Sequence, residues 1–505
     1  MSKYFMMLMV AFVTLSCSKK VEVTGNFAGG SPLERIEFIE ASGVATLPLT
    51  NIGVDAKGSF SGSFDAPKNG MYIMSYAGKT AMIYLKGGQK FHISGQAENF
   101  PAQFTITGDA KKNNDFLKNL QEFIQGYASK INVGELVTKK EDQFLKDIQR
   151  IQTDIEKNID DSAKKTSADS EVVLFKKDEL KASLLGLLNQ YEVAHPQATQ
   201  NPSYKPSANF KKLEDDWNKD SDRLVKNHPV YRNYLLQKYN SEFQTFQSAN
   251  DKDRTALDSE TFSKFLDTKK DMPQITKDYL LAFVLASGDV SPNTTPENSK
   301  KIAKLIEDKV KDATIKKDLQ RISFVIEGPK VGDEISSANL IDKDGKSEKL
   351  SGTSAKPKLV LFYTSWNPYI AERTFPVLKE VVNFYKPKVD FAFVNLDDTK
   401  DQFTKTSTAV LKGISGKSLY AENGLNSQIA KDLGLYGFKL PSLVVVDKNG
   451  KIASKFFFDL GDPEFVTAMD KISGLKAPMV EEPQIQLQND LLAPQNQAPQ
   501  PAPTK

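Results

Sequence analysis

Few residues in this chain could carry out acid-base, nucleophilic or redox chemistry. Its 505 residues include one cysteine, Cys17, and three widely separated histidines, His92, His195 and His228. A single cysteine excludes an intramolecular disulfide, a Cys-x-x-Cys redox pair and a multi-cysteine metal site. The scarcity of histidine argues against imidazole-based catalysis and histidine metal sites, so we expect no metal and no cofactor.

Cys17 follows an apolar N-terminal segment. Residues 4–13 are apolar and come after Lys3, and they are shorter than the ~20 residues that a membrane-spanning helix needs. Residues 1–16 therefore indicate a signal peptide, and residues 14–17 (Thr-Leu-Ser-Cys) resemble a bacterial lipobox. We expect residues 17–20 to form a lipidated N-terminus held in a membrane through acylated Cys17, because two acyl chains anchor a protein stably. The alternative is an ordinary signal peptide with an incidental cysteine.

Composition and charge limit the partners of the chain. Its 67 basic and 64 acidic residues nearly cancel, giving a net charge of +3, so we expect no nucleic-acid partner. The apolar content of 39% suits globular domains with real cores, and the length suggests roughly three of them. The residues after Cys17 lack an acidic cluster, which favours a position at the outer membrane, facing the periplasm.

The hydrophobic pattern changes twice along the chain. Alternating short runs predict an all-β sandwich over 21–110, and apolar residues at helical spacing predict a helical domain over 111–327. Residues 328–476 mix buried strands and amphipathic helices, which predicts an α/β domain ending in a hairpin over 443–458 and a helix over 463–472. Residues 477–505 are rich in proline and glutamine and predict a disordered tail. The fold class is therefore multidomain α+β.

Three local features of the helical region carry expectations of their own. Residues 160–170 are polar and predict a loop, within which Asp161-Ser162-Ala163 resembles a short O-glycosylation motif of Bacteroidetes. His195 and His228 each precede a proline, which predicts a helix break at both positions.

Four stretches of the α/β region together resemble the thioredoxin-like domain of the TlpA/ResA type, as found in lipoproteins of Bacteroidetes. They are Gly332-Asp-Glu-Ile, the strand from Lys358 to Trp366, Pro376 in the following helix, and the segment 436–452, which contains Leu440-Pro441. The resemblance implies a thioredoxin-like fold with a cis bond before Pro441. It covers about 145 residues, 328–476.

The sequence departs from this family where the family has its catalytic cysteines. The resemblance places Cys-x-x-Cys after the tryptophan, whereas this chain reads Trp366, Asn367, Pro368, Tyr369 and Ile370. Asn367 can cap the helix, but it cannot attack a disulfide. The nearby hydroxyls have no evident base, so we expect no hydroxyl nucleophile.

Without the cysteines, the resemblance still implies a groove that could bind a peptide. In thioredoxin folds the residue before the cis-proline presents its backbone to an extended peptide, a role that would fall to Leu440 and Pro441 beside Trp366 and Tyr369. The alternative is that these aromatic residues are structural and that the domain supports an assembly.

Three functions remain open. The first is a redox-inactive accessory protein, chaperone or scaffold that binds an envelope protein and is anchored to the membrane by lipid. The second is a thiol-disulfide oxidoreductase or peroxiredoxin-like enzyme, as the family resemblance implies. The third is capture of a peptide or glycan by the β-domain.

Overall fold

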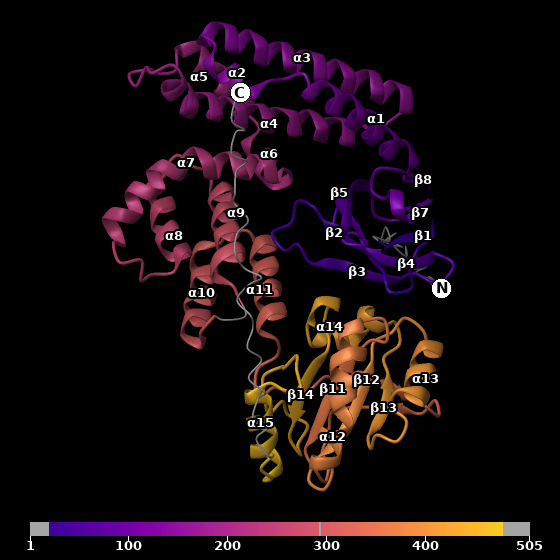
Figure 1. Cartoon of the computed structure of the whole chain (residues 1–505). Coiled ribbons are helices and arrows are strands. Elements are labelled where there is room, and N and C mark those ends of the chain that lie inside the picture. Colours follow the sequence, from indigo (N-terminus) through magenta and orange to yellow (C-terminus); the bar gives the residue numbers. More distant parts are fainter. Residues whose placement is uncertain (1–19, 292–293, 478–505) are drawn as a thin grey trace, which may run out of the picture.

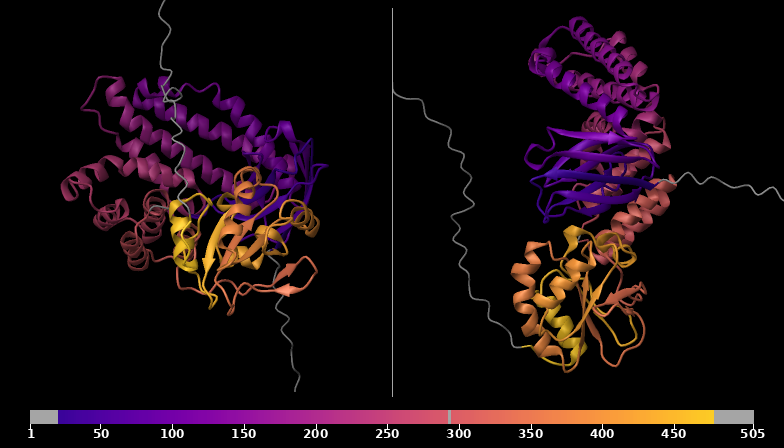
Figure 2. Two further views of the ribbon diagram at one scale, coloured as in Figure 1. Left: turned by 60° about the horizontal axis from the view of Figure 1, so that its bottom comes forward. Right: turned by 90° about the vertical axis from the view of Figure 1, so that its right-hand side faces the viewer.

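The computed structural model describes residues 20–291 and 294–477. It contains an N-terminal β-domain, a helical middle domain and a C-terminal α/β domain, as the sequence predicts (Figure 1). The β-domain lies between the first long helices and the C-terminal domain, which two directions of view show (Figure 2). Cys17 and the tail from residue 478 lie outside the described residues.

The β-domain consists of two four-stranded sheets, ordered β4-β1-β7-β8 and β3-β2-β5-β6. Alternation drives their packing: on β2, Ile36 and Phe38 point into the core, and Arg35 and Glu37 point out of it. Aromatic rings fill the interior, with Phe27 stacked on Tyr76 at 4.6 Å between centroids. The strands are β1 (Lys20–Ala28), β2 (Arg35–Glu40), β3 (Pro48–Gly53), β4 (Ser59–Asp65), β5 (Gly70–Tyr76), β6 (Lys79–Leu85), β7 (Lys90–Gln96) and β8 (Phe104–Gly108).

Both edges of the second sheet are met by an asparagine from another domain. On β6, the side chain of Asn114 accepts from the amide of Tyr84 at 2.9 Å and donates to its carbonyl at 3.0 Å. On β3, Asn426 accepts from the amide of Asn51 at 3.2 Å and donates to its carbonyl at 2.9 Å. Each carboxamide thus replaces one residue of a neighbouring strand, and the two contacts join the β-domain to the other domains.

The middle domain is built from helices whose apolar faces share one core. Ile148, Ile151, Ile155 and Ile159 follow one face of α3, as the spacing predicts. The helices are α1 (Lys111–Ala128), α2 (Val133–Thr138), α3 (Glu141–Thr166), α4 (Ser170–Ala198), α5 (Ala208–Asn218), α6 (Ser221–Asn227), α7 (Pro229–Asn250), α8 (Asp258–Thr268), α9 (Gln274–Val284), α10 (Pro296–Lys309) and α11 (Ala313–Glu327). Among the described residues, no helix is both long and apolar enough to cross a bilayer.

Two expectations for this domain are wrong. The predicted loop over 160–170 is mostly helix, because α3 continues to Thr166 and its polar residues form an exposed face. Ser162 lies on the buried side of α3, 8% exposed, and does not present the predicted glycosylation motif in a loop. His195-Pro196 does not break α4, since this proline falls in the last turn. The break at His228 is confirmed, with Pro229 at the first position of α7.

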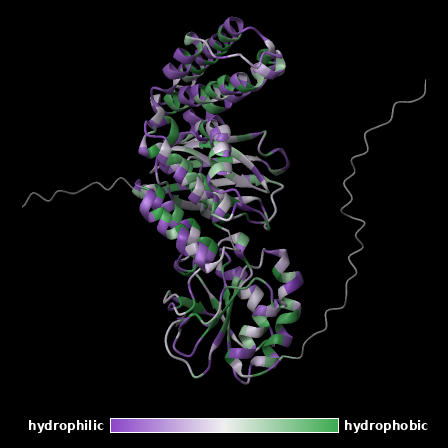
Figure 3. Ribbon diagram, turned by 90° about the vertical axis from the view of Figure 1, so that its left-hand side faces the viewer, coloured by the Kyte–Doolittle hydropathy of each residue, from purple (hydrophilic) through white to green (hydrophobic). Residues whose placement is uncertain are grey.

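The C-terminal domain has a six-stranded sheet ordered β10-β9-β13-β12-β11-β14. Strand β11 lies between parallel β12 and antiparallel β14, and its residues 359–363 are all buried, as the continuous apolar run predicts. Figure 3 shows hydrophobic residues, in green, along strands of this domain. The elements are β9 (Leu340–Asp342), β10 (Ser347–Glu348), β11 (Lys358–Tyr363), α12 (Phe375–Tyr385), β12 (Asp390–Asn395), α13 (Lys400–Ala409), β13 (Lys417–Tyr420), α14 (Gln428–Asp432), β14 (Ser442–Val446) and α15 (Pro463–Ser473).

The structure corrects the hairpin predicted over 443–458 and adds two elements to this domain. Residues 451–458 contact β14 only through isolated bridges, Val446 with Ile452 and Leu443 with Phe457, so the expected hairpin lacks a regular second strand. Helix α13 and strand β13 were not predicted. The capping box formed by Thr399 and Gln402 marks the start of α13 and could have revealed it.

Candidate functional site

The candidate site lies where β11 ends and the next helix begins. The helical segment starts at Pro368, and Asn367 caps it: its Oδ1 accepts from the amide of Tyr369 at 3.0 Å. A wider π-helical turn over Ile370–Thr374 precedes α12. Pro376 lies in the first turn of α12 and has no amide hydrogen to donate, which accounts for the irregular hydrogen bonding before it.

Asn367 binds the loop on the opposite side of the site. Its Nδ2 donates to the carbonyl of Leu440 at 3.0 Å, directly before the cis Leu440–Pro441 bond. The amide of Leu440 donates to the carbonyl of Gly437 at 3.3 Å. Both backbone polar groups of Leu440 therefore already have a partner within the chain, so an extended peptide would have to displace Gly437 to reach the amide.

Trp366 is covered by the β-domain. The guanidinium carbon of Arg35 lies 4.7 Å from the centroid of the indole ring, which is a cation–π contact. The same guanidinium donates to both oxygens of Asp398, at 2.5 and 2.7 Å, and through Nε to Asn51 at 2.6 Å. Arg35 thus fixes the outer face of β2 against the loop that follows β12.

Tyr369 and Ile370 lie in different surroundings. Tyr369 is 42% exposed and donates its hydroxyl to Asp459 at 3.0 Å. Phe458, next to Asp459, is 48% exposed, and Phe438, two residues before Leu440, is 67% exposed. Ile370 is fully buried in the domain core. Three aromatic residues in the segments around the site, Tyr369, Phe438 and Phe458, therefore remain exposed, although Trp366 is covered.

Buried polar groups lie beneath the site. Asp397 has no exposed surface; it accepts from the amide of Ser365 at 2.8 Å and from Asn395 at 2.7 Å. Burial raises the pKa of its carboxyl group. Among the described residues, Thr364 Oγ1, Ser442 Oγ and Trp366 Nε1 are buried without a hydrogen-bond partner. Thr364 is fully buried, so its hydroxyl is not placed to attack a substrate.

The histidines lie outside this domain. His92 contacts Thr24 on a neighbouring β-strand at 3.0 Å, and His195 contacts the carbonyl of Val137 at 2.7 Å. His228 packs on Phe175, with ring centroids 4.3 Å apart, and burial lowers its pKa to about 4. Across residues 20–291 and 294–477, no three His, Cys, Asp or Glu side chains group closely enough to hold a metal ion.

Sequence reasoning missed four residues around the site: Arg35, Asp398, Asn426 and Lys439. Lys439 precedes Leu440, is 7% exposed and donates to the carbonyl of Val325 in α11 at 2.5 Å. Burial lowers the pKa of this lysine to about 8. No local signal could have identified Arg35, because its partner Asp398 is 363 positions away in the sequence.

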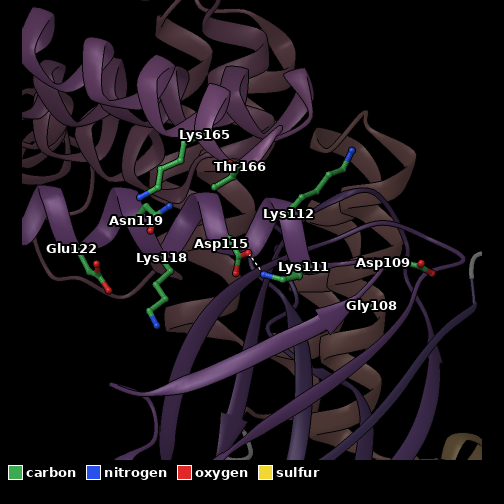
Figure 4. Close-up of a pocket in the computed structure, with 10 residues that line it drawn as sticks. All are labelled: Gly108, Asp109, Lys111, Lys112, Asp115, Lys118, Asn119, Glu122, Lys165 and Thr166. Carbon is green, nitrogen blue, oxygen red and sulfur yellow. Dashed lines mark hydrogen bonds and ion pairs between the residues drawn. The ribbon is translucent and has the colours of Figure 1, made fainter.

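A separate open hollow of about 780 Å³ lies along the start of α1 (Figure 4). Four lysines line it, but Lys111 is paired with Asp115 and Lys112 with Asp169. Three carboxylates, Asp109, Asp115 and Glu122, line the same hollow and offset most of the lysine charge, so it gives no indication of an anion site.

Comparisons with known proteins concern the C-terminal domain. Residues 355–452 match the family model described as thioredoxin-like. One similar solved structure is the C-terminal domain of a provisionally assigned thiol-disulfide oxidoreductase from Bacteroides thetaiotaomicron, with 23% identity, a TM-score of 0.25, and 29% of this chain and 97% of that chain covered. Another is the thioredoxin domain of a thiol-disulfide oxidoreductase from Bacteroides vulgatus, with 19% identity, a TM-score of 0.24, and coverages of 28% and 99%. No curated protein matches the chain.

The C-terminal domain is therefore thioredoxin-like. The chain adds a β-domain and a helical domain before it. Its one cysteine, Cys17, precedes all three.

Proposed function

We propose that this chain is an exported, lipid-anchored accessory protein of the cell envelope. Its thioredoxin-like domain binds a protein partner and acts as a scaffold or chaperone, without thiol-disulfide chemistry. The observation that carries the proposal is the contact of Asn367 with the carbonyl of Leu440, since a structural carboxamide occupies the position that the family gives to a nucleophilic cysteine.

The absence of redox chemistry follows from the residue types. Disulfide exchange needs a thiolate that attacks a sulfur atom and a second thiol that resolves the mixed disulfide. At the two positions concerned the chain has Asn367 and Ile370, and the latter packs in the core. Cys17 is the one cysteine in the sequence, and acylation would consume its thiol. No thiol is then left to replace the two missing cysteines.

Partner binding is supported by the three exposed aromatic residues Tyr369, Phe438 and Phe458. These side chains are exposed, and aromatic residues contribute strongly to protein interfaces. Because both backbone groups of Leu440 already have partners within the chain, we expect the partner to contact mainly side chains.

The lipid anchor would hold the β-domain at the membrane surface. Strand β1 begins at Lys20, so only residues 18 and 19 separate Cys17 from the sandwich. Two residues span at most about 7 Å. With this short spacing we expect the β-domain to lie next to the lipid, and the lack of an acidic cluster after Cys17 favours the outer membrane, facing the periplasm. Mass spectrometry tests the lipid anchor itself. The mature chain should begin at Cys17 with added acyl mass, and an unmodified cysteine would contradict the anchor.

The rival function is a thiol-disulfide oxidoreductase or peroxiredoxin-like enzyme, which the thioredoxin-like family match favours. Insulin-disulfide reduction and peroxide consumption by the purified chain distinguish the two. We expect rates equal to those without protein. Turnover that is lost on substituting Asn367 or Tyr369 would overturn the proposal.

Partner binding is tested by affinity purification from detergent-solubilised envelopes at native expression. The double variant Tyr369→Ala, Phe438→Ala should lose the partner that the natural chain retains. A matched control is Phe384→Ala, because Phe384 is an exposed aromatic residue on α12. Equal recovery from the natural chain and the double variant would exclude Tyr369 and Phe438 from the binding surface.

A further inference from the structure

A cavity of about 270 Å³ lies where the three domains meet. Its walls come from β2 and β3, from the end of α11, and from residues 425–437 around α14, which lie together in Figure 1. Asn367 and Tyr369 do not line it, but Asn426 and Gly437 do, so the cavity adjoins the candidate site without including its helix start. Cavities between domains are common positions for small-ligand sites.

Much of the cavity wall is apolar. Five of the residues that line it are Leu49, Phe324, Val325, Leu425 and Leu435. At ~30 Å³ per water molecule, the volume equals roughly nine waters, which is the space for a ligand of about nine heavy atoms. A ligand of this size would need an apolar body.

One carboxylate faces the cavity. Glu37 points away from the sandwich core, because strand alternation directs Ile36 and Phe38 inward. Its Oε1 accepts from Asn51 at 2.6 Å, which is its one hydrogen bond within the part of the chain that the structure describes. Burial raises the pKa of this carboxyl group, so a cation from a ligand would stabilise its charged form.

Two cationic side chains line the same cavity. Arg321 donates to the hydroxyl of Tyr436 at 2.9 Å and is exposed beyond that contact. Lys431 is exposed on α14. Neither forms an ion pair with any residue in the described ranges. Nearby Lys439, bonded to Val325, adds further positive charge.

We propose that this cavity binds a free amino acid with an apolar side chain, of about the size of leucine. Arg321 and Lys431 bind the carboxylate, Glu37 binds the ammonium group, and the side chain packs near Phe324 and Leu435. A zwitterion satisfies both signs of charge in one small cavity, which neither a simple anion nor a simple cation does. Such a ligand contacts all three domains and therefore stabilises their arrangement.

Calorimetric titration of the full chain with L-leucine tests the proposal, together with two probes that each lack one charge. Leucine amide lacks the carboxylate and N-acetyl-leucine lacks the ammonium group. We expect leucine to bind and each probe to bind at least about tenfold more weakly, because each loses a charged hydrogen bond. If either probe binds as tightly as leucine, or leucine gives no heat at about 10 mM, the proposal is wrong.

Variants assign the binding to this cavity. Arg321→Gln and Glu37→Gln should each weaken leucine binding by about tenfold or more. Tyr436→Phe keeps the charge of Arg321 and should change the affinity less than about threefold. Lys412→Gln removes an exposed lysine outside the cavity and should have no effect. Unchanged affinity in Arg321→Gln would overturn the assignment, and if that variant fails to fold, the probe series still decides.

Discussion

Arg35 of the β-domain and Asp398 of the thioredoxin-like domain form a two-point ion pair, with N–O distances of 2.5 and 2.7 Å. The side chain of Arg35 is 10% exposed, and its guanidinium also lies over Trp366. A partly buried guanidinium with two carboxylate contacts is geometrically specific, so this pair fixes the register between the two domains. The part of a thioredoxin-like surface around Trp366 is in this chain an interdomain contact.

Replacing Arg35 with methionine should uncover Trp366. It removes the charge from above the ring and leaves Asp398 without its cation, so the free energy of unfolding should fall by about 2 kcal/mol. The chain has two tryptophans, and Trp217 is buried in the helical core, so a Trp217→Phe background isolates the signal of Trp366. We expect a red-shifted emission and stronger acrylamide quenching. Arg373→Met is the control, and equal quenching in both variants would contradict the contact.

Asn426→Asp should loosen the edge of β3. The carboxylate keeps the size of the side chain but removes the donor to the carbonyl of Asn51, and it places negative charge beside that oxygen. We expect a loss of about 1–3 kcal/mol in stability and faster hydrogen exchange at the amide of Asn51. Asn449→Asp, in an exposed turn, is the matched control. Exchange that stays as slow as in the natural chain would argue against this edge contact.

Restoring two cysteines should return redox chemistry to the domain. In Asn367→Cys, Ile370→Cys the first thiol would lie at the start of a helical segment, where its pKa falls. On a Cys17→Ser background, intact-mass analysis should show the loss of two hydrogens on oxidation, and insulin reduction should appear above the rate without protein. Adding Arg35→Met should raise this rate, because the β-domain then covers the site less tightly. A double variant that never forms the disulfide would show that this loop has lost the geometry as well as the cysteines.

Lys439 should give the stability of the chain a specific dependence on alkaline pH. Its ordinary pKa of 10.5 falls to about 8 in the folded chain. Between these values the unfolded chain holds a proton that the folded chain has released. This group therefore makes the free energy of unfolding increase as the pH is raised from 8 to 10.5, and below pH 8 it adds no pH dependence.

In Lys439→Met this component should be absent. Tyrosines also titrate above pH 9, so the informative quantity is the difference in thermal midpoint between the natural chain and the variant at each pH. That difference should change between pH 8 and 10.5. A constant difference for Lys439→Met would contradict a buried ammonium group.

The sequence predicted the three-part architecture well because hydrophobic periodicity is local. Alternation placed Ile36 and Phe38 in the sandwich core, helical spacing placed Ile148 to Ile159 in the helical core, and a continuous apolar run identified β11. Its errors were also local in origin. Polarity over 160–170 suggested a loop, whereas a long helix tolerates a wholly polar exposed side, and Pro196 fits the end of α4.

For the candidate site as well, some properties follow from the sequence alone and others only from the tertiary structure. The residue types alone determined that no cysteine follows Trp366 and that Asn367 can cap a helix, since both statements depend on neighbours in the sequence. Only the tertiary structure decided what these residues touch: Asn367 meets Leu440, 73 positions later, and Trp366 meets Arg35 from another domain. Such contacts depend on how separately folded domains pack together. Periodicity carries no information about that packing, because the outward faces of strands and helices are free to be polar whether they meet water or another domain.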